Sequence, residues 1–180
     1  MDIESVLKGH GLGIGGSNIK SIQRGQYILQ SADKTVNLAI STVDLTKAIV
    51  LIHFNATLDS INPKMIDIQA TITSTNILTL TRTLAGAGSS NGSVVSWQVI
   101  EFNNVKSLQR GVWTVSATGS IGISPVNINK TILLESHTST GDNASDMFLS
   151  LYLASPTNIL VTKGTSTYSY SMYWYAIEFN

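Results

Sequence analysis

The sequence contains no cysteine, which excludes disulfides, thiolate metal sites and cysteine nucleophiles. Charged residues are also scarce, at 12% of the chain against about 25% in an average soluble protein. Lysine plus arginine number 11, as do aspartate plus glutamate, and this balance argues against a nucleic-acid binder, which normally has a basic excess. Because a charge-poor surface lowers the solubility of a free monomer, the composition favours a protein that packs against copies of itself or another protein.

Long apolar runs are missing as well. The opening residues, MDIESVLKGHG, carry two acids and no apolar run long enough for a signal peptide, so we expect no leader. No segment approaches the roughly 18 apolar residues of a membrane helix. Only three prolines are present, and no long stretch has helical periodicity, so we expect almost no helix.

Strand patterns dominate from residue 19 onward. Thr, Val, Ile and Ser are abundant, and the apolar residues alternate in short runs. Val36, Leu38 and Ile40 alternate cleanly, whereas Ala48–Phe54 is nearly all apolar, as in a strand that is covered on both faces. These patterns predict an all-β fold.

Four phrases occur in the same order in both halves of the chain, which indicates an internal duplication. They are IKSIQRG (19–25) and VKSLQRG (105–111), ISTVDLTK (40–47) and ISPVNINK (123–130), TSTNIL (73–78) and ASPTNIL (154–160), and SWQVIEFN (96–103) and YWYAIEFN (173–180). We predict two tandem repeats, at residues 19–103 and 104–180, each with the size of a β-sandwich or small barrel.

Residues 1–18 stand apart from the repeats. They contain five glycines within ten residues, a density that predicts a flexible N-terminal arm or tether. The stretch lacks the preceding strand, the following helix and the Lys-Ser/Thr pair of a phosphate-binding loop. The glycines of this predicted tether are Gly9, Gly11, Gly13, Gly15 and Gly16.

One arginine and one glutamate in each repeat are predicted to form an ion pair. By the period of two along a strand, Arg24 and Glu101 each project from a largely apolar face, as do Arg110 and Glu178. An unpaired buried charge is costly, so we expect partly buried Arg24–Glu101 and Arg110–Glu178 pairs that tie first strand to last. The alternative is a catalytic or carboxylate-binding arginine.

Five aromatic residues crowd one stretch near the C-terminus. Such a cluster can be buried in a subunit interface or can stack on sugars. We predict an interface; packing against the first repeat and sugar binding are the alternatives. The residues are Tyr168, Tyr170, Tyr173, Trp174 and Tyr175.

No catalytic residue, metal site or cofactor is predicted. The three histidines are scattered, and no nucleophile–base spacing stands out. Residues 135–146 gather Glu135, His137, Asp142 and Asp146, but their spacing fits no calcium loop.

The combination of phrases resembles a group of small β-rich structural proteins of tailed bacteriophages. In that group a QRG strand, a V-D-L-S/T-K turn and a closing W-x-V-x-E-F strand follow a short Gly-containing start. Repeat 2 matches more loosely, with Asn127 in place of Asp44. The matching segments are 23–25, 43–47 and 97–102 in repeat 1, and 109–111, 126–130 and 174–179 in repeat 2.

The resemblance implies a virion component without a catalytic residue. We therefore expect a capsid decoration protein or another head or tail accessory protein, made in the host cytoplasm without a signal peptide. Its expected partners are copies of itself, for instance in a trimer, and other virion proteins, but not nucleic acid or a membrane. The alternative is a receptor- or carbohydrate-binding adhesin module that uses the aromatic cluster or the loops at 89–93 and 137–146.

Overall fold

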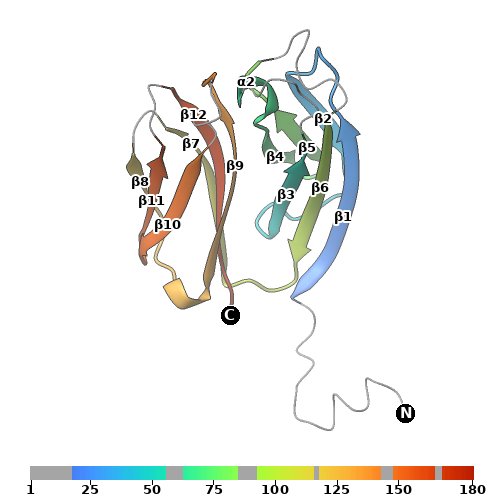
Figure 1. The fold of residues 1–180 in the computed structure, drawn as a ribbon. Helices are drawn as coiled ribbons and strands as arrows, with labels where there is room; N and C mark the ends of the chain where they lie inside the picture. The colour runs from blue at the N-terminus through green and yellow to red at the C-terminus, as the bar shows by residue number, and fades with distance from the viewer. Residues whose placement is uncertain (1–17, 56–62, 85–92, 116–117, 143–147, 165–167) are drawn as a thin grey trace, which may run out of the picture.

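The protein consists of antiparallel β-sheets, as the sequence predicts. The structure, a computed structural model, describes residues 18–55, 63–84, 93–115, 118–142, 148–164 and 168–180 (Figure 1). The described residues form twelve strands in four three-stranded sheets, which pair into two sandwich-like units. The predicted glycine-rich tether lies outside the described residues. No helix in the described part is long and apolar enough to cross a membrane.

Repeat 1 contributes two of these sheets, with the strand orders β1-β6-β3 and β2-β5-β4. A single helical turn, α2 (Pro63–Ile66), precedes β4. The strands are β1 (Ile19–Ile28), β2 (Thr35–Ala39), β3 (Ala48–Phe54), β4 (Gln69–Ser74), β5 (Ile77–Thr81) and β6 (Val94–Phe102).

Repeat 2 has the same arrangement, with the orders β7-β12-β9 and β8-β11-β10. A short 3-10 turn, η1 (Ile128–Lys130), precedes β9. The duplication therefore extends from sequence to topology. The strands are β7 (Ser107–Val115), β8 (Gly119–Gly122), β9 (Thr131–Ser139), β10 (Leu149–Ser155), β11 (Asn158–Lys163) and β12 (Tyr170–Glu178).

The β7-β12-β9 sheet lies in the middle of the molecule and serves two cores. Figure 1 shows β9 and β12 between the rest of repeat 2 and the strands of repeat 1. On one face, Met172, Trp174 and Ala176 pack with Ile159 of β11. On the other face, Tyr175 and its neighbours belong to the core of repeat 1. Both faces of β12 are therefore buried within one chain.

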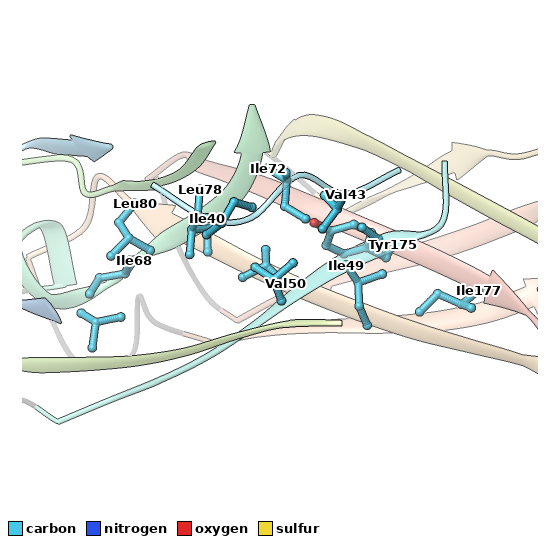
Figure 2. Packing of buried hydrophobic residues seen from close by; sticks show 14 of the residues in the cluster. Ile40, Val43, Ile49, Val50, Ile68, Ile72, Leu78, Leu80, Tyr175 and Ile177 are labelled. Carbon is cyan, nitrogen blue, oxygen red and sulfur yellow. The ribbon is translucent and has the colours of Figure 1, made fainter. Parts of the chain in front are cut away.

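Tyr175 fills the open side of the first sandwich, between β3 and β4. Its side chain is 1% exposed and lies among Val43, Ile49 and Ile72, as Figure 2 shows. The edge of β4 is covered at the same place, because the Ser136 hydroxyl accepts from the Ala70 amide at 3.0 Å. Repeat 2 thus closes the core of repeat 1.

The matching phrases TSTNIL and ASPTNIL do not place their shared residues on the same faces of the two sheets. Both hairpins keep a two-residue turn, with Ser74 opposite Ile77 and Ser155 opposite Asn158. The inserted residue in repeat 2 therefore shifts the shared TNIL letters by one position. Because a one-residue shift turns every side chain to the other face, Leu160 is 37% exposed.

Candidate functional site

Glu101, near the end of β6, is the centre of a polar network in repeat 1. It is 2% exposed. It accepts hydrogen bonds from Lys20 Nζ at 2.9 Å, from the Asp44 amide at 2.9 Å and from Ser21 Oγ at 3.4 Å. Burial opposes ionisation, but the bonds from Lys20 and the Asp44 amide outweigh it, so the pKa of Glu101 lies below its ordinary value.

Repeat 2 reproduces this network around Glu178. Lys106 Nζ donates at 2.8 Å, the Asn127 amide at 2.9 Å and Ser107 Oγ at 3.4 Å. The Lys106 hydrogen bond, with the Asn127 amide, holds the pKa of Glu178 below its ordinary value. The Asp44-to-Asn127 difference has no effect here, because only the backbone amide of that position takes part.

The predicted Arg24–Glu101 and Arg110–Glu178 pairs are wrong. Arg24 stands opposite Gln98 in the ladder and donates Nε to its Oε1 at 3.5 Å, and Arg110 stands opposite Tyr175. Opposed residues share a face, so both arginines project from the face away from the glutamates. A β-bulge at the start of β1 brings Lys20 to the carboxylate instead.

The glutamine of the repeated phrase also has the same role twice. The Ser41 amide donates to Gln23 Oε1 at 2.6 Å, and Gln23 Nε2 donates to the Ser41 carbonyl at 2.9 Å. Gln109 and Ser124 form the same two bonds at 2.7 and 3.0 Å. The glutamine side chain therefore holds the loop after β2 or β8 by bonding both backbone groups of one loop residue, as a neighbouring β-strand does.

The glycine of the phrase makes room for a tryptophan. A Cβ atom added at Gly25 would overlap the Trp97 indole, and one at Gly111 would lie 3.2 Å from the Trp174 ring. Close approach to a facing side chain is a common reason for glycine inside a strand. In both repeats, structural roles therefore fall to four residues of the phrase: the lysine, the serine, the glutamine and the glycine.

The aromatic cluster is not a subunit interface in the predicted form. Tyr170 and Tyr175 are each 1% exposed and Trp174 is 7% exposed, all within this one chain. Tyr173 is half-buried against the core of repeat 1, and Tyr168 is half-buried. The alternative of packing on the first repeat is correct for Tyr175. Sugars cannot stack on rings this deeply buried.

A polar cluster lies at the repeat junction, where the segment between α2 and β4 meets β9. His137 Nδ1 lies 2.9 Å from Glu135 Oε2, and His137 Nε2 lies 3.8 Å from Asp67 Oδ2. Asp67 is 3% exposed, and burial raises its pKa to about 7, with His137 opposing the rise and Glu135 adding to it. These side chains, with Ile52 and Phe54, line a cavity of about 140 Å³.

This cluster does not form a metal centre. Within the described ranges, no group of three His, Cys, Asp or Glu side chains could hold an ion. Asp142 pairs instead with Lys64 at 2.8 Å across the same junction, and Asp146 lies outside the described residues. The sequence did not point to Asp67, because its proximity to His137 depends on how the repeats pack.

The strongest candidate site is an open groove between the edge strands β9 and β10, with a volume of about 480 Å³ and a lining of both apolar and uncharged polar side chains. We call it the β9–β10 groove. Among the residues that the structure describes, no lysine, arginine, aspartate or glutamate lines it, and Tyr152, at its rim, is 63% exposed. The lining residues are Ile128, Asn129, Thr131, Leu133, Leu151, Tyr152, Leu153 and Ala154.

The equivalent place in repeat 1 is filled. Pairing with the central strand aligns Val50 with Leu133, and pairing with β5 or β11 aligns Ile72 with Leu153. Val50 and Ile72 are 6% and 3% exposed, whereas Leu133 and Leu153, which line the groove, are only half-buried. The difference arises because Tyr175 covers the repeat 1 edge and has no counterpart over repeat 2.

Comparisons with known proteins found no match, whether with a family model, a curated protein or a solved structure. The resemblance to phage structural proteins therefore stays a prediction from the repeated motifs.

Proposed function

We propose that the chain is a structural component of a bacteriophage virion, a capsid decoration protein or another head or tail accessory protein that acts by assembly and not by catalysis. The observation that carries this proposal is the uncovered β9–β10 groove. It leaves a core edge of repeat 2 open among the described strands, whereas the matching edge of repeat 1 is closed.

The chemistry of the groove suits protein–protein contact. Its described lining combines leucine and isoleucine side chains with an exposed tyrosine and contains no lysine or acidic residue. Interface centres are likewise rich in aromatic residues and poor in charge. Large exposed apolar surfaces on a protein mark binding surfaces. The overall formal charge of zero removes long-range repulsion between copies in an assembly.

A non-catalytic role agrees with how the repeated polar residues are used. Glu101 and Glu178 are engaged by lysine and backbone donors, and both glutamines clamp a loop. The titratable group with the most perturbed pKa among the carboxylates, Asp67, lies between the repeats and faces His137. These groups hold the two sandwiches in shape.

A carbohydrate-binding adhesin is the second candidate, favoured by one observation. The exposed Tyr152 ring stands beside the polar side chains of Asn129 and Thr131, and an open ring with polar neighbours suits stacking on a sugar. Glycan-array binding that disappears in Tyr152→Ala and persists in Val112→Ala would favour this role over assembly.

The virion proposal is tested on particles of the phage that encodes the chain. Gradient-purified particles are examined by mass spectrometry and by labelling with an antibody raised against the protein. We expect the chain to copurify with the particles in fixed stoichiometry and the label to mark the head or the tail. A chain that stays entirely in the lysate supernatant would overturn the proposal.

A further inference from the structure

Strand β10 is an edge strand without the usual protection against pairing. It has one neighbour, β11, and its sequence LSLYLAS contains no charge and no proline. Natural sheet edges are normally blocked by lysine, proline, a bulge or a covering segment. The side chains of β10 alternate regularly between half-buried and exposed, and the one register shift in its pairing with β11 lies at its end, between Leu153 and Ser155.

The matching edge of repeat 1 shows that this protein covers such an edge where it can. The Ser136 hydroxyl accepts from the Ala70 amide and donates to the Ala70 carbonyl, at 3.0 and 3.3 Å. Gln69 Nε2 donates to the Ser171 carbonyl at 2.9 Å. The edge of β4 is therefore occupied by repeat 2, whereas no other described strand pairs with the outer edge of its counterpart β10.

We propose that two copies of this chain associate by antiparallel pairing of β10 with β10 of the second copy, which closes both β9–β10 grooves. The two β8-β11-β10 sheets then join into one six-stranded sheet across a two-fold axis. The inward-facing Leu151 and Leu153 of each copy add apolar side chains over the partner's groove. The inference gives the groove of the proposed function a specific partner.

A second copy fits this edge better than an unrelated protein for two reasons. Antiparallel pairing of a strand with itself is self-complementary, and two-fold dimers are the commonest symmetric assembly. No charged residue lines the groove among those that the structure describes, so bringing two identical grooves together places no like charges of that lining in contact. The exposed Tyr152 ring and the groove beside it also provide a projection and a recess on the same surface.

The absence of cysteine makes the pairing directly measurable in the full chain. Single cysteines are placed on the outward face of β10, as Ser150→Cys, Tyr152→Cys and Ala154→Cys, and are oxidised singly and in pairwise mixtures. In an antiparallel two-fold pair, each position of β10 faces one fixed position of the partner strand. Either a residue faces its own copy or two of these residues face each other, so the variants or mixtures that match the register should form disulfide dimers far faster than the rest. Val112→Cys, at a site 60% exposed on β7, is the matched control.

Association is measured in parallel by sedimentation of the purified protein. The native chain should sediment as a dimer of the 19.3 kDa protomer, and Tyr152→Lys should give a folded monomer, while Val112→Lys remains dimeric. A native chain that stays monomeric, or cysteine pairs in β10 that form no faster than Val112→Cys pairs, would overturn the inference. Neither result bears on whether the chain is found in purified particles, which is measured separately.

Discussion

Lys20 Nζ lies 2.9 Å from Glu101 Oε1, and the same contact recurs in repeat 2 between Lys106 and Glu178. The lysine side chains are 56% and 59% exposed, whereas the side chains of the two glutamates, taken without their backbone atoms, are 3% and 2% exposed. Each glutamate is therefore held mainly by its several donors together, with the lysine approaching from solvent. The buried glutamate should therefore contribute more to the free energy of unfolding than the exposed lysine that contacts it.

Glu101→Gln should destabilise the protein by about 1–3 kcal/mol, because the Lys20 and Asp44 donors lose a buried charged acceptor. Lys20→Gln should cost only about 0–1 kcal/mol, since its side chain is more than half exposed. Arg24→Gln is the matched control and should stay within about 0.5 kcal/mol of the native protein. Urea unfolding measures all three; an Arg24 effect as large as that of Glu101 would contradict the network.

Gly25→Ala should be more destabilising than Gly111→Ala. The added Cβ overlaps the Trp97 ring in repeat 1 but lies 3.2 Å from the Trp174 ring in repeat 2. Forced overpacking costs about 1–3 kcal/mol, so we expect Gly25→Ala in that range and Gly111→Ala below it. Thermal unfolding gives the ranking, and a red shift of tryptophan fluorescence in Gly25→Ala would report displacement of the indole. Equal effects at both sites would count against this packing.

Tyr175→Ala should destabilise repeat 1 as well as repeat 2, because the ring fills the core beside Ile49 and Ile72. Truncation of a large buried aromatic ring costs about 3–5 kcal/mol. Tyr152→Ala, which removes the same atoms from an exposed site, should cost about 0.5 kcal/mol or less when measured at low protein concentration. Hydrogen exchange should show lost protection in β3 and β4 for Tyr175→Ala alone; protection that stays native there would disprove the shared core.

Asp67 should make the protein less stable as the pH rises towards neutrality. Its pKa is about 7 in the folded state against an ordinary value of 3.8 for an aspartate, so the folded state holds the proton more tightly than the unfolded chain. The stability that this group contributes is therefore complete below pH about 4 and is lost as the pH rises through about 7. Other titratable groups add their own slopes, so the effect is read from a variant.

Asp67→Asn removes this loss. The variant should gain up to about 4 kcal/mol over the native protein at pH 8, and the gain should vanish near pH 4. Asp142→Asn, which breaks the surface pair with Lys64, is the control and should show no such gain. Thermal midpoints across this pH range measure the difference. A gain that does not depend on pH would show that Asp67 is not protonated in the folded state near neutrality.

The fold class and the duplication could be predicted because their signals are local. Alternating apolar residues define each strand, and the repeated phrases occur in one order. The partner of Glu101 could not be predicted, because it depends on the register between β1 and β6 and on the bulge at Lys20. These two features decide which side chains of β1 share a face with Glu101. The burial of Tyr175 depends on a neighbouring repeat, and no local pattern in STYSYSMYWYAIEF distinguishes such a neighbour from a second subunit.

The central sheet also dictates the order in which the chain can finish folding. During synthesis β3 and β4 emerge long before β12. Ile49 and Ile72 therefore remain uncovered on one side until Tyr175 has been synthesised and packs against them. Such distant contacts slow folding and leave apolar surface exposed in the interval. The first sandwich therefore lacks part of its core until β12 has been synthesised, so both repeats need this one strand to complete their packing.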